Sequence, residues 1–115
     1  MRILVCGGRR YDDRTKVFDV LDTLNYRTPI TVVLQGGASG ADSLARDWAD
    51  ERGIEVQTYV SGTTQDGRAS WSRGNQWMLD EGRPNLVVAF PGVRRTADMV
   101  LRAKSAGVTV IEVFR

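Results

Sequence analysis

Histidine is absent from the sequence, and cysteine occurs once, at Cys6. Histidine is the usual base of serine and cysteine nucleophile systems, and histidine and cysteine are the usual ligands of structural zinc. We therefore expect neither such a catalytic system nor a metal site. A single cysteine also excludes an internal disulfide, which favours a cytoplasmic protein. Because Cys6 ends an apolar stretch, we expect a buried, unreactive thiol there.

Long apolar runs and a strong charge imbalance are also missing. No run approaches the ~20 residues of a membrane-spanning helix, and the apolar start of the chain is too short for a signal peptide. The formal net charge is +2, with acidic and basic residues interleaved, so we expect neither a membrane nor a duplex DNA partner. A length of 115 residues with 42% hydrophobic residues predicts one compact domain over residues 1–115.

Apolar stretches alternate with segments of helical period along the chain. Val17, Leu21 and Leu24, for example, repeat at the spacing of one helix face. Strands are expected at 2–6, 30–34, 54–60, 86–90 and 108–113. Helices are expected between the first two strands, after a cap at Asp12 or Asp13, and at about 41–52, 70–81 and 96–106. This alternation predicts an α/β fold, a single Rossmann-like three-layer sandwich of about five mainly parallel strands with helices on both faces.

The turn from Gln35 to Asp42 is the most distinctive stretch, with three glycines between a strand and a helix. Glycine lets the backbone adopt a positive φ and come close to a ligand. The following helix start contributes N–H groups and the positive end of its dipole, so a phosphate or a carboxylate fits this turn. A plain tight turn is the alternative. Ser39 and Asp42 have the spacing of a capping box, and Gly53 is expected to end the helix.

Other loops share this character and are predicted to lie beside the turn. In a parallel sheet the carboxyl ends of the strands lie at one edge, where ligands of open α/β sheets bind. The loops at 7–9, 36–40, 61–70 and 91–92 leave from that edge. Arg9, Arg73, Arg94 and Arg95 are placed to reach it, and guanidinium groups bind phosphate through two parallel hydrogen bonds. The sequence therefore predicts a ligand with a phosphate, although Arg94 and Arg95 also fit a solvated helix start.

Three motifs are similar to those of one known superfamily. They are Gly7-Gly8-Arg9, the run from Gly36 to Asp42, and Phe90-Pro91-Gly92 followed by Thr96-Ala97-Asp98-Met99. Together they resemble the SLOG superfamily over nearly the whole chain, and within it most closely the small YspA-like domains. The superfamily also contains the Lonely guy phosphoribohydrolases and the DNA-processing protein DprA/Smf. The resemblance implies a Rossmann-like fold that binds a nucleotide or a nucleotide derivative at the carboxyl ends of its strands, in a homodimer or a larger homo-oligomer.

The resemblance also implies which residues carry chemistry. In Lonely guy enzymes an arginine and a glutamate cut the N-glycosidic bond of a nucleoside 5′-monophosphate. The arginine corresponds to Arg73 and the glutamate to Met99, which cannot act as an acid. Asp98 is the nearest substitute, although compensation of the helix dipole is the simpler interpretation of this residue. Val93 and Arg95 stand where the Lonely guy motif has glycines. The expected ligand-binding residues are Gly7, Gly8, Arg9, Gly36, Gly37, Ala38, Ser39, Gly40, Asp42, Asn75, Pro91, Gly92, Arg94, Arg95 and Thr96.

Three functions follow, in this order. The first is binding of a nucleotide or a nucleotide-derived phosphate by a sensor or a sequestering module, which needs only the loops and the arginines. The second is a nucleotide N-glycosidase, which needs an acid in the pocket, at Asp98, Asp42 or Asp12. The third is binding of single-stranded nucleic acid. None of the three requires a cofactor or a metal, and we expect none. The helical spacing of Trp71 and Trp77 favours core positions over stacking on a base.

Overall fold

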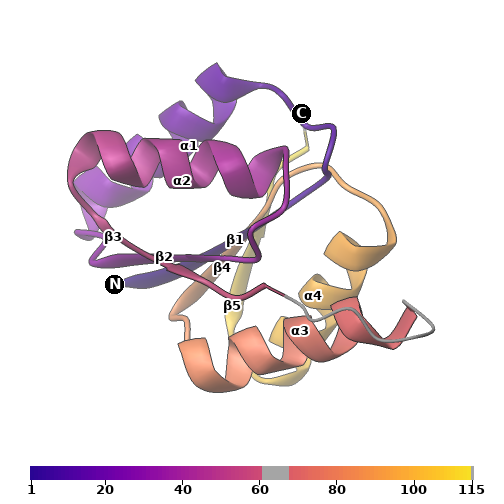
Figure 1. Cartoon of the computed structure of the whole chain (residues 1–115). Coiled ribbons are helices and arrows are strands. Elements are labelled where there is room, and N and C mark those ends of the chain that lie inside the picture. The colour runs from indigo at the N-terminus through magenta and orange to yellow at the C-terminus, as the bar shows by residue number, and fades with distance from the viewer. Residues whose placement is uncertain (61–67, 115) are drawn as a thin grey trace.

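The computed structural model in Figure 1 describes residues 1–60 and 68–114 and contains a five-stranded sheet. The strands are Arg2–Cys6 (β1), Val32–Gln35 (β2), Glu55–Thr58 (β3), Leu86–Ala89 (β4) and Thr109–Glu112 (β5). All neighbouring strands are parallel, in the order β3-β2-β1-β4-β5. The predicted α/β fold with a parallel sheet is therefore confirmed, and each strand overlaps its predicted segment.

Two helices cover each face of the sheet and complete the three layers. Arg14–Arg27 (α1) and Ala41–Arg52 (α2) lie on one face, and Arg68–Gly82 (α3) and Arg94–Ser105 (α4) lie on the other (Figure 1). Among the described residues, no helix has the length and apolar character needed to cross a membrane. The strand order reverses between β1 and β4, so the connections of these two strands diverge to opposite faces. In open α/β sheets a crevice for ligands opens at this point.

The sheet separates two hydrophobic clusters because successive residues of a strand face opposite sides. Ile3 and Val5 of β1 pack with Trp48 and with other buried side chains of α1 and α2. Leu4, between them, packs on the other side with Met99 and with buried side chains of α3 and α4. Strands β2 and β4 are buried along their whole length, as expected of parallel strands covered on both faces. This core fixes the carboxyl ends of the central strands side by side.

The ends of α1 and α2 agree with the sequence at two positions and differ at a third. Asp13 caps α1 by accepting a hydrogen bond from the N–H three residues on (3.0 Å), and Gly53 ends α2 in the left-handed conformation (φ 67°). The predicted capping box of Ser39 and Asp42 is wrong. The residue before α2 is Gly40, and no side chain caps this helix, because the Asp42 carboxylate turns back to hold the preceding loop.

The start of α4 also differs from the prediction. The sequence predicts a helix from about residue 96, but α4 begins two residues earlier, at Arg94, after an N-cap at Val93. Thr96 is buried within the first turn, where its hydroxyl packs so closely against Gly92 that a Cβ added there would overlap it. Arg94 and Arg95 therefore both belong to the first turn of the helix.

Helix α3 follows a segment that lies largely outside the described residues. The predicted loop at 61–70 falls mostly on that segment, and α3 begins at Arg68, slightly before its predicted start. Trp77 is not the core residue that its spacing predicts. It is 46% exposed and packs edge-on against Tyr59, with ring centroids 4.9 Å apart. The side chain of Trp71 lies outside the described part of the chain.

Candidate functional site

Hydrogen bonds hold three of the predicted loops together at the carboxyl edge of the sheet. The Gly8 N–H donates to the carbonyl O of Pro91 (2.8 Å), which joins the loop after β1 to the loop after β4. The carbonyl O of Gly8 accepts from the Ala41 N–H (3.2 Å), and the Ser39 hydroxyl donates to the carbonyl O of Arg9 (3.2 Å). These two bonds join the loop after β1 to the loop after β2. The predicted convergence of these three loops is confirmed.

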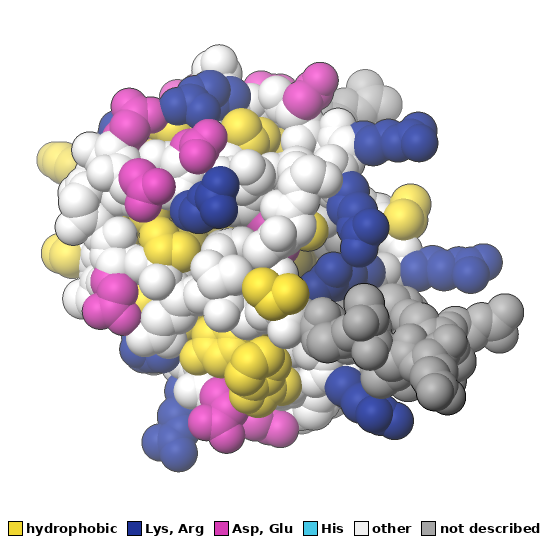
Figure 2. Space-filling view, in the orientation of Figure 1, with side chains coloured by type: hydrophobic (Ala, Val, Ile, Leu, Met, Phe, Trp, Pro, Cys, Tyr) yellow, Lys and Arg dark blue, Asp and Glu magenta, His cyan; other side chains and the backbone are white. Residues whose placement is uncertain are grey.

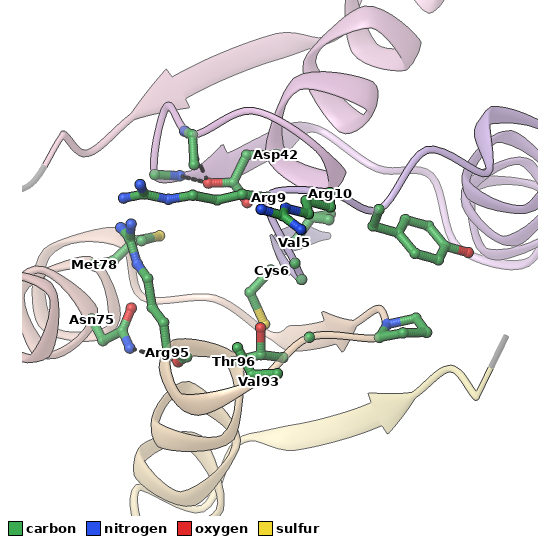
Figure 3. Close-up of a pocket in the computed structure, with 17 residues that line it drawn as sticks. Val5, Cys6, Arg9, Arg10, Asp42, Asn75, Met78, Val93, Arg95 and Thr96 are labelled. Atoms are coloured by element: carbon green, nitrogen blue, oxygen red, sulfur yellow. Dashed lines mark hydrogen bonds between the residues drawn. The ribbon is translucent and has the colours of Figure 1, made fainter.

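A pocket of about 440 Å³ opens between these loops and α3, at the point where the strand order reverses (Figure 3). Four segments contribute to it: the end of β1 with its loop, the loop after β2 with the start of α2, the middle of α3, and the loop after β4 with the start of α4. The residues that line it are Val5, Cys6, Gly7, Gly8, Arg9, Arg10, Tyr11, Gly36, Ala38, Asp42, Asn75, Met78, Pro91, Gly92, Val93, Arg95 and Thr96. Its size suits a small-molecule ligand.

Cationic side chains dominate the charge of the pocket. Arg9 and Arg10 line it from the loop after β1, and Arg95 lines it from α4, whereas Asp42 is the one carboxylate among the described lining residues. In Figure 3 the guanidinium groups of Arg9 and Arg95 lie on the same side of the pocket as the Asp42 carboxylate. Figure 2 shows a row of Lys and Arg side chains along the side of the molecule where the loops after β1 and β4 lie in Figure 1. An anionic ligand is therefore favoured there.

The glycine loop, the turn from Gln35 to Asp42, uses several of its own N–H groups internally. One carboxylate oxygen of Asp42 accepts hydrogen bonds from the N–H groups of Gly36 (3.0 Å) and Ala38 (3.3 Å). The buried Gln35 side chain accepts from the Gly37 N–H (2.6 Å). The prediction that this turn presents its N–H groups to an anion is wrong for these three residues, because the protein's own side chains already accept from them. The loop instead shapes the pocket wall.

Asp42 is a buried carboxyl group near two cations. Its exposed fraction is 6%, and burial raises the pKa of this carboxyl above its usual value. The hydrogen bond from Ala38, the charge of Arg95, the hydrogen bond from Gly36 and the charge of Arg9 oppose this rise in pKa without cancelling it. Asp42 therefore keeps its proton to a higher pH than an ordinary aspartate does, which suits a carboxyl that acts as an acid.

Cys6 lines the pocket but does not offer a nucleophile. Burial raises the pKa of the Cys6 thiol to about 12, and the charge of Asp42 adds to the rise while that of Arg95 opposes it. The thiol stays protonated at neutral pH, and only the thiolate is a strong nucleophile. This agrees with the predicted unreactive thiol, but Cys6 is half-buried and not fully buried as the sequence suggests, because it lines the pocket.

Two glycines are needed because protein groups approach each other closely here. Gly40 has a φ of 76°, which favours glycine, and a Cβ at this position would overlap the carbonyl O of Gly8. At Gly36, a Cβ would lie 2.9 Å from Arg95 Nη2 and 3.1 Å from Asp42 Oδ2. The missing side chain at Gly36 thus gives Arg95 room beside the Asp42 carboxylate.

The residues that the resemblance marks as catalytic lie outside the pocket lining. Arg73 is exposed on α3. Asp98 accepts hydrogen bonds from Arg102 Nε (2.7 Å) and from Asn75 Nδ2 (3.0 Å), in a polar network between α3 and α4. Met99, at the position of the Lonely guy glutamate, is fully buried in the core. The geometry thus gives Asp98 a part in helix packing.

Asn75 connects this network to the pocket. It is 2% exposed and lines the pocket, and its Nδ2 also donates to the carbonyl O of Arg95 (3.1 Å). Arg102 extends the network by donating through Nη1 to Gln76 (2.8 Å). Because Asn75 holds the backbone of Arg95, it fixes the first turn of α4 relative to α3.

The motifs predicted most of the pocket lining. The predicted residues that line it are Gly7, Gly8, Arg9, Gly36, Ala38, Asp42, Asn75, Pro91, Gly92, Arg95 and Thr96. The predicted residues that do not line it are Gly37, Ser39, Gly40, Arg73, Arg94 and Asp98. The lining residues that the motifs did not predict are Val5, Cys6, Arg10, Tyr11, Met78 and Val93. Two signals for them were present: Arg10 adjoins Arg9 in the same loop, and Met78 follows Asn75 at helical spacing.

Comparison with known proteins places this arrangement in a family. The family model described as "YspA, cpYpsA-related SLOG family" matches residues 1–64, more than half of the chain. The chain belongs to this family. Gene 61 protein of Mycobacterium phage D29 is 33% identical over an alignment of 118 positions, which covers 96% of this chain and 94% of that protein.

A solved structure supports the fold. The X-ray structure of DNA processing protein A (DprA) from Streptococcus pneumoniae matches with a TM-score of 0.79 over 99% of this chain. The sequence identity is 16%, so this similarity concerns the fold. The chain spans half the length of that DprA chain. The predicted SLOG relationship and the Rossmann-like fold are thus both confirmed.

Proposed function

We propose that this chain binds a nucleotide or a nucleotide-derived phosphate in the pocket, as a sensor or as a sequestering module. The observation that carries the proposal is the convergence of Arg9 and Arg95 on one pocket at the reversal of strand order, from segments that lead to opposite faces of the sheet. Guanidinium groups bind phosphate oxygens through paired, charge-assisted hydrogen bonds. Membership of the SLOG family supports a function related to nucleotides or nucleic acids.

The start of α4 supports a phosphate position near Arg95. The first N–H groups of a helix have no partner within the helix, and the positive end of the helix dipole lies there. Arg94 and Arg95 add two cations to this end, and no acidic residue lies in the first turn. These cations repel each other and the positive end of the helix dipole. A phosphate held between Arg9, Arg95 and the first turn of α4 would offset this repulsion. Apolar lining residues such as Val5 and Met78 suit the base or the ribose.

The proposal is tested by a thermal-shift screen of the purified protein. The ligands are mononucleotides, NAD, ADP-ribose, cyclic nucleotides, inorganic phosphate and a short single-stranded oligonucleotide. A ligand present at 100 times its Kd should stabilise the fold by ~2.7 kcal/mol, which gives a clear rise in melting temperature. Binding of a small nucleotide is expected, and the oligonucleotide tests the third function directly. No rise with any small ligand would contradict the proposal.

Two neighbouring arginines provide a matched pair of variants. Arg95→Gln should weaken binding of the ligand by about tenfold or more, because hydrogen bonds to charged groups contribute ~1.5–3 kcal/mol. Arg94→Gln removes the same charge from the same helix turn, but Arg94 is exposed and does not line the pocket. It should therefore change the Kd by about twofold or less. Equal effects of the two variants would mean that general charge, and not the pocket, attracts the ligand.

A nucleotide N-glycosidase is the second candidate function, and Asp42 is the observation that favours it. Asp42 is the one carboxyl group among the described lining residues, and burial raises its pKa, so it can hold a proton for a leaving base. Asp98 is less suited because Arg102 and Asn75 already bind its carboxylate.

Chromatography of the incubated ligand separates the two candidates. Recovery of intact nucleotide identifies a binding module, whereas free base and sugar phosphate identify the enzyme. Asp42→Asn should then abolish turnover while binding of the nucleotide persists, and Asp98→Asn should leave turnover largely unchanged. Loss of turnover in Asp98→Asn alone would assign the acid to Asp98 instead.

A further inference from the structure

A second hollow lies beside the pocket, on the other flank of the start of α4. This recess has a volume of about 390 Å³ and lies between α4 and the end of β5. Pro91, Gly92, Val93 and Thr96 line both the pocket and the recess, so this segment forms a wall with one hollow on each side. Val93 and Thr96 mark the wall in Figure 3. The two hollows are therefore neighbours at one edge of the sheet.

The recess differs from the pocket in its chemistry. No Lys or Arg is among its described lining residues, and Glu112 is the one charged residue there. Glu112 accepts a hydrogen bond from Lys104 (3.3 Å) at the surface. Phe114 lines the recess and is 82% exposed, so a face of its ring is open to contact. An exposed aromatic ring beside an apolar recess suits a ligand with a planar, uncharged ring. The Glu112 carboxylate can accept hydrogen bonds from N–H groups of that ligand ring.

The position of the recess relative to the strand order suggests which part of a ligand would occupy it. In open α/β sheets, dinucleotides bind across the point where the strand order reverses, with their pyrophosphate at a helix start. Here the wall includes the start of α4. The pocket lies beside the ends of β1 and β2, and the recess lies beside the ends of β4 and β5. A ligand with its phosphates at the wall therefore has one hollow for each of its ends.

We infer that the ligand has two arms, with a nucleoside in the pocket and a second, uncharged ring system in the recess against Phe114. Its chemical class is a pyrophosphate-linked compound with a ring at both ends, such as a dinucleoside diphosphate. This inference rests on the proposed function, because it assigns a second arm to the same ligand. The second ring would also cover Val93, which is 80% exposed and lines both hollows.

The test compares ligands with one ring and with two. Isothermal titration calorimetry measures the Kd of ADP, GDP, CDP and UDP and of the symmetric dinucleoside diphosphates of the same four bases. The dinucleoside diphosphate of at least one base should bind about tenfold or more tightly than its nucleoside diphosphate, as expected when one further base stacks on an aromatic side chain. The nucleoside diphosphate carries the greater negative charge, so attraction to the arginines alone would give the opposite order.

Variants locate the second arm. Phe114→Ala should remove most of the tenfold difference and leave the Kd of the nucleoside diphosphate unchanged. Leu101→Ala is the matched control, because Leu101 is a 67% exposed apolar residue of α4 that lines neither hollow, and it should change neither Kd. Both side chains are exposed, so both variants should keep the melting temperature of the unmodified chain.

Three results would overturn the inference. Equal or weaker binding of every dinucleoside diphosphate would remove the second arm while binding of the nucleoside diphosphates still supports the proposed function. Absence of binding by all eight compounds would contradict both the second arm and the proposed function. If Phe114→Ala instead converts a dimer to a monomer in sedimentation and leaves the ratio of the two Kd values unchanged, a second copy of the chain covers the recess.

Discussion

Two loops border the pocket from opposite faces of the sheet, and they contribute to it in different ways. The glycine loop after β2 closes on itself, because Asp42 and Gln35 accept hydrogen bonds from its N–H groups. The loop after β4 leads through Pro91 into α4, whose first turn carries Arg94 and Arg95 and no acidic residue. The comparison teaches that the glycines of the loop after β2 allow close packing within the protein. The cationic start of α4 is what provides a position for an anion.

The largest expected effect comes from a methyl group at Gly40, which tests whether the glycine loop serves packing. Gly40→Ala should lower the free energy of unfolding by about 3 kcal/mol or more, because unfavourable backbone geometry and overpacking each cost ~1–3 kcal/mol. The added Cβ would overlap the carbonyl O of Gly8. Urea denaturation measures the loss.

Gly53 provides the control for this change. It also has a positive φ (67°), but a Cβ added there meets nothing within 4 Å. Gly53→Ala should therefore cost only the ~1 kcal/mol of a left-handed backbone. Equal losses in the two variants would mean that the loops after β1 and β2 are not held together as described.

The next effect tests the closure of the glycine loop by Asp42. Asp42→Ala should lower the free energy of unfolding by about 2–3 kcal/mol, because it leaves the buried N–H group of Gly36 and the partly buried N–H group of Ala38 without an acceptor. Asp42→Asn keeps an acceptor oxygen and should cost about 1 kcal/mol. Arg94→Ala, at an exposed position in the first turn of α4, should stay within ~0.5 kcal/mol. A loss at Asp42 no larger than that at Arg94 would contradict the internal role of this carboxylate.

A smaller effect is expected at Asn75, which ties α3 to the first turn of α4. Asn75→Ala should cost about 1–2 kcal/mol of stability, through its lost hydrogen bonds to Asp98 and to the backbone of Arg95. It should also weaken nucleotide binding, since Arg95 is then less firmly positioned. Gln76→Ala removes a bond to Arg102 but none to Arg95, so stability should fall slightly while the Kd stays the same. A Kd that changes equally in both variants would show that Asn75 does not position Arg95.

The fold followed from periodicity, whereas the details at the loops required tertiary structure. Apolar spacing such as Val17 to Leu21 predicted the helices, and apolar stretches such as 86–90 predicted the strands. The strand order and its reversal between β1 and β4 had no local signal in the sequence. Trp77 shows the same limit, because helical spacing does not tell which face of a helix packs against the rest of the protein. This side chain lies at the surface against Tyr59.

The sequence predicted which residues line the site better than it predicted what each of them does there. Arg9 and Arg95 were expected at the pocket and line it. The role of Asp42 was not predicted, because sequence spacing favours a helix cap, while the loop geometry brings its carboxylate to N–H groups four and six residues before it. Asp98 likewise lies beside the expected position, but one residue along a helix turns a side chain by about 100°, and here it meets Arg102.

The smallest expected effect is a pH dependence of stability that Asp42 causes. Burial raises the pKa of this carboxyl in the folded protein above the ordinary aspartate value of 3.8. The folded state therefore binds the proton more tightly than the unfolded state does. The stability that this carboxyl contributes is complete below pH 3.8 and is lost as the pH rises through the folded pKa.

Urea denaturation of the unmodified chain and of Asp42→Asn, at several pH values between 3.5 and 7, measures this effect. The free energy of unfolding of the unmodified chain, relative to Asp42→Asn, should fall as the pH rises above 3.8 and then become constant. A bound phosphate would raise the pKa further and strengthen the dependence. A difference that grows with pH would show that Arg9 and Arg95 stabilise the carboxylate more than burial destabilises it. Asp42 would then already balance the cationic side of the pocket, and the contrast between the two loops would disappear.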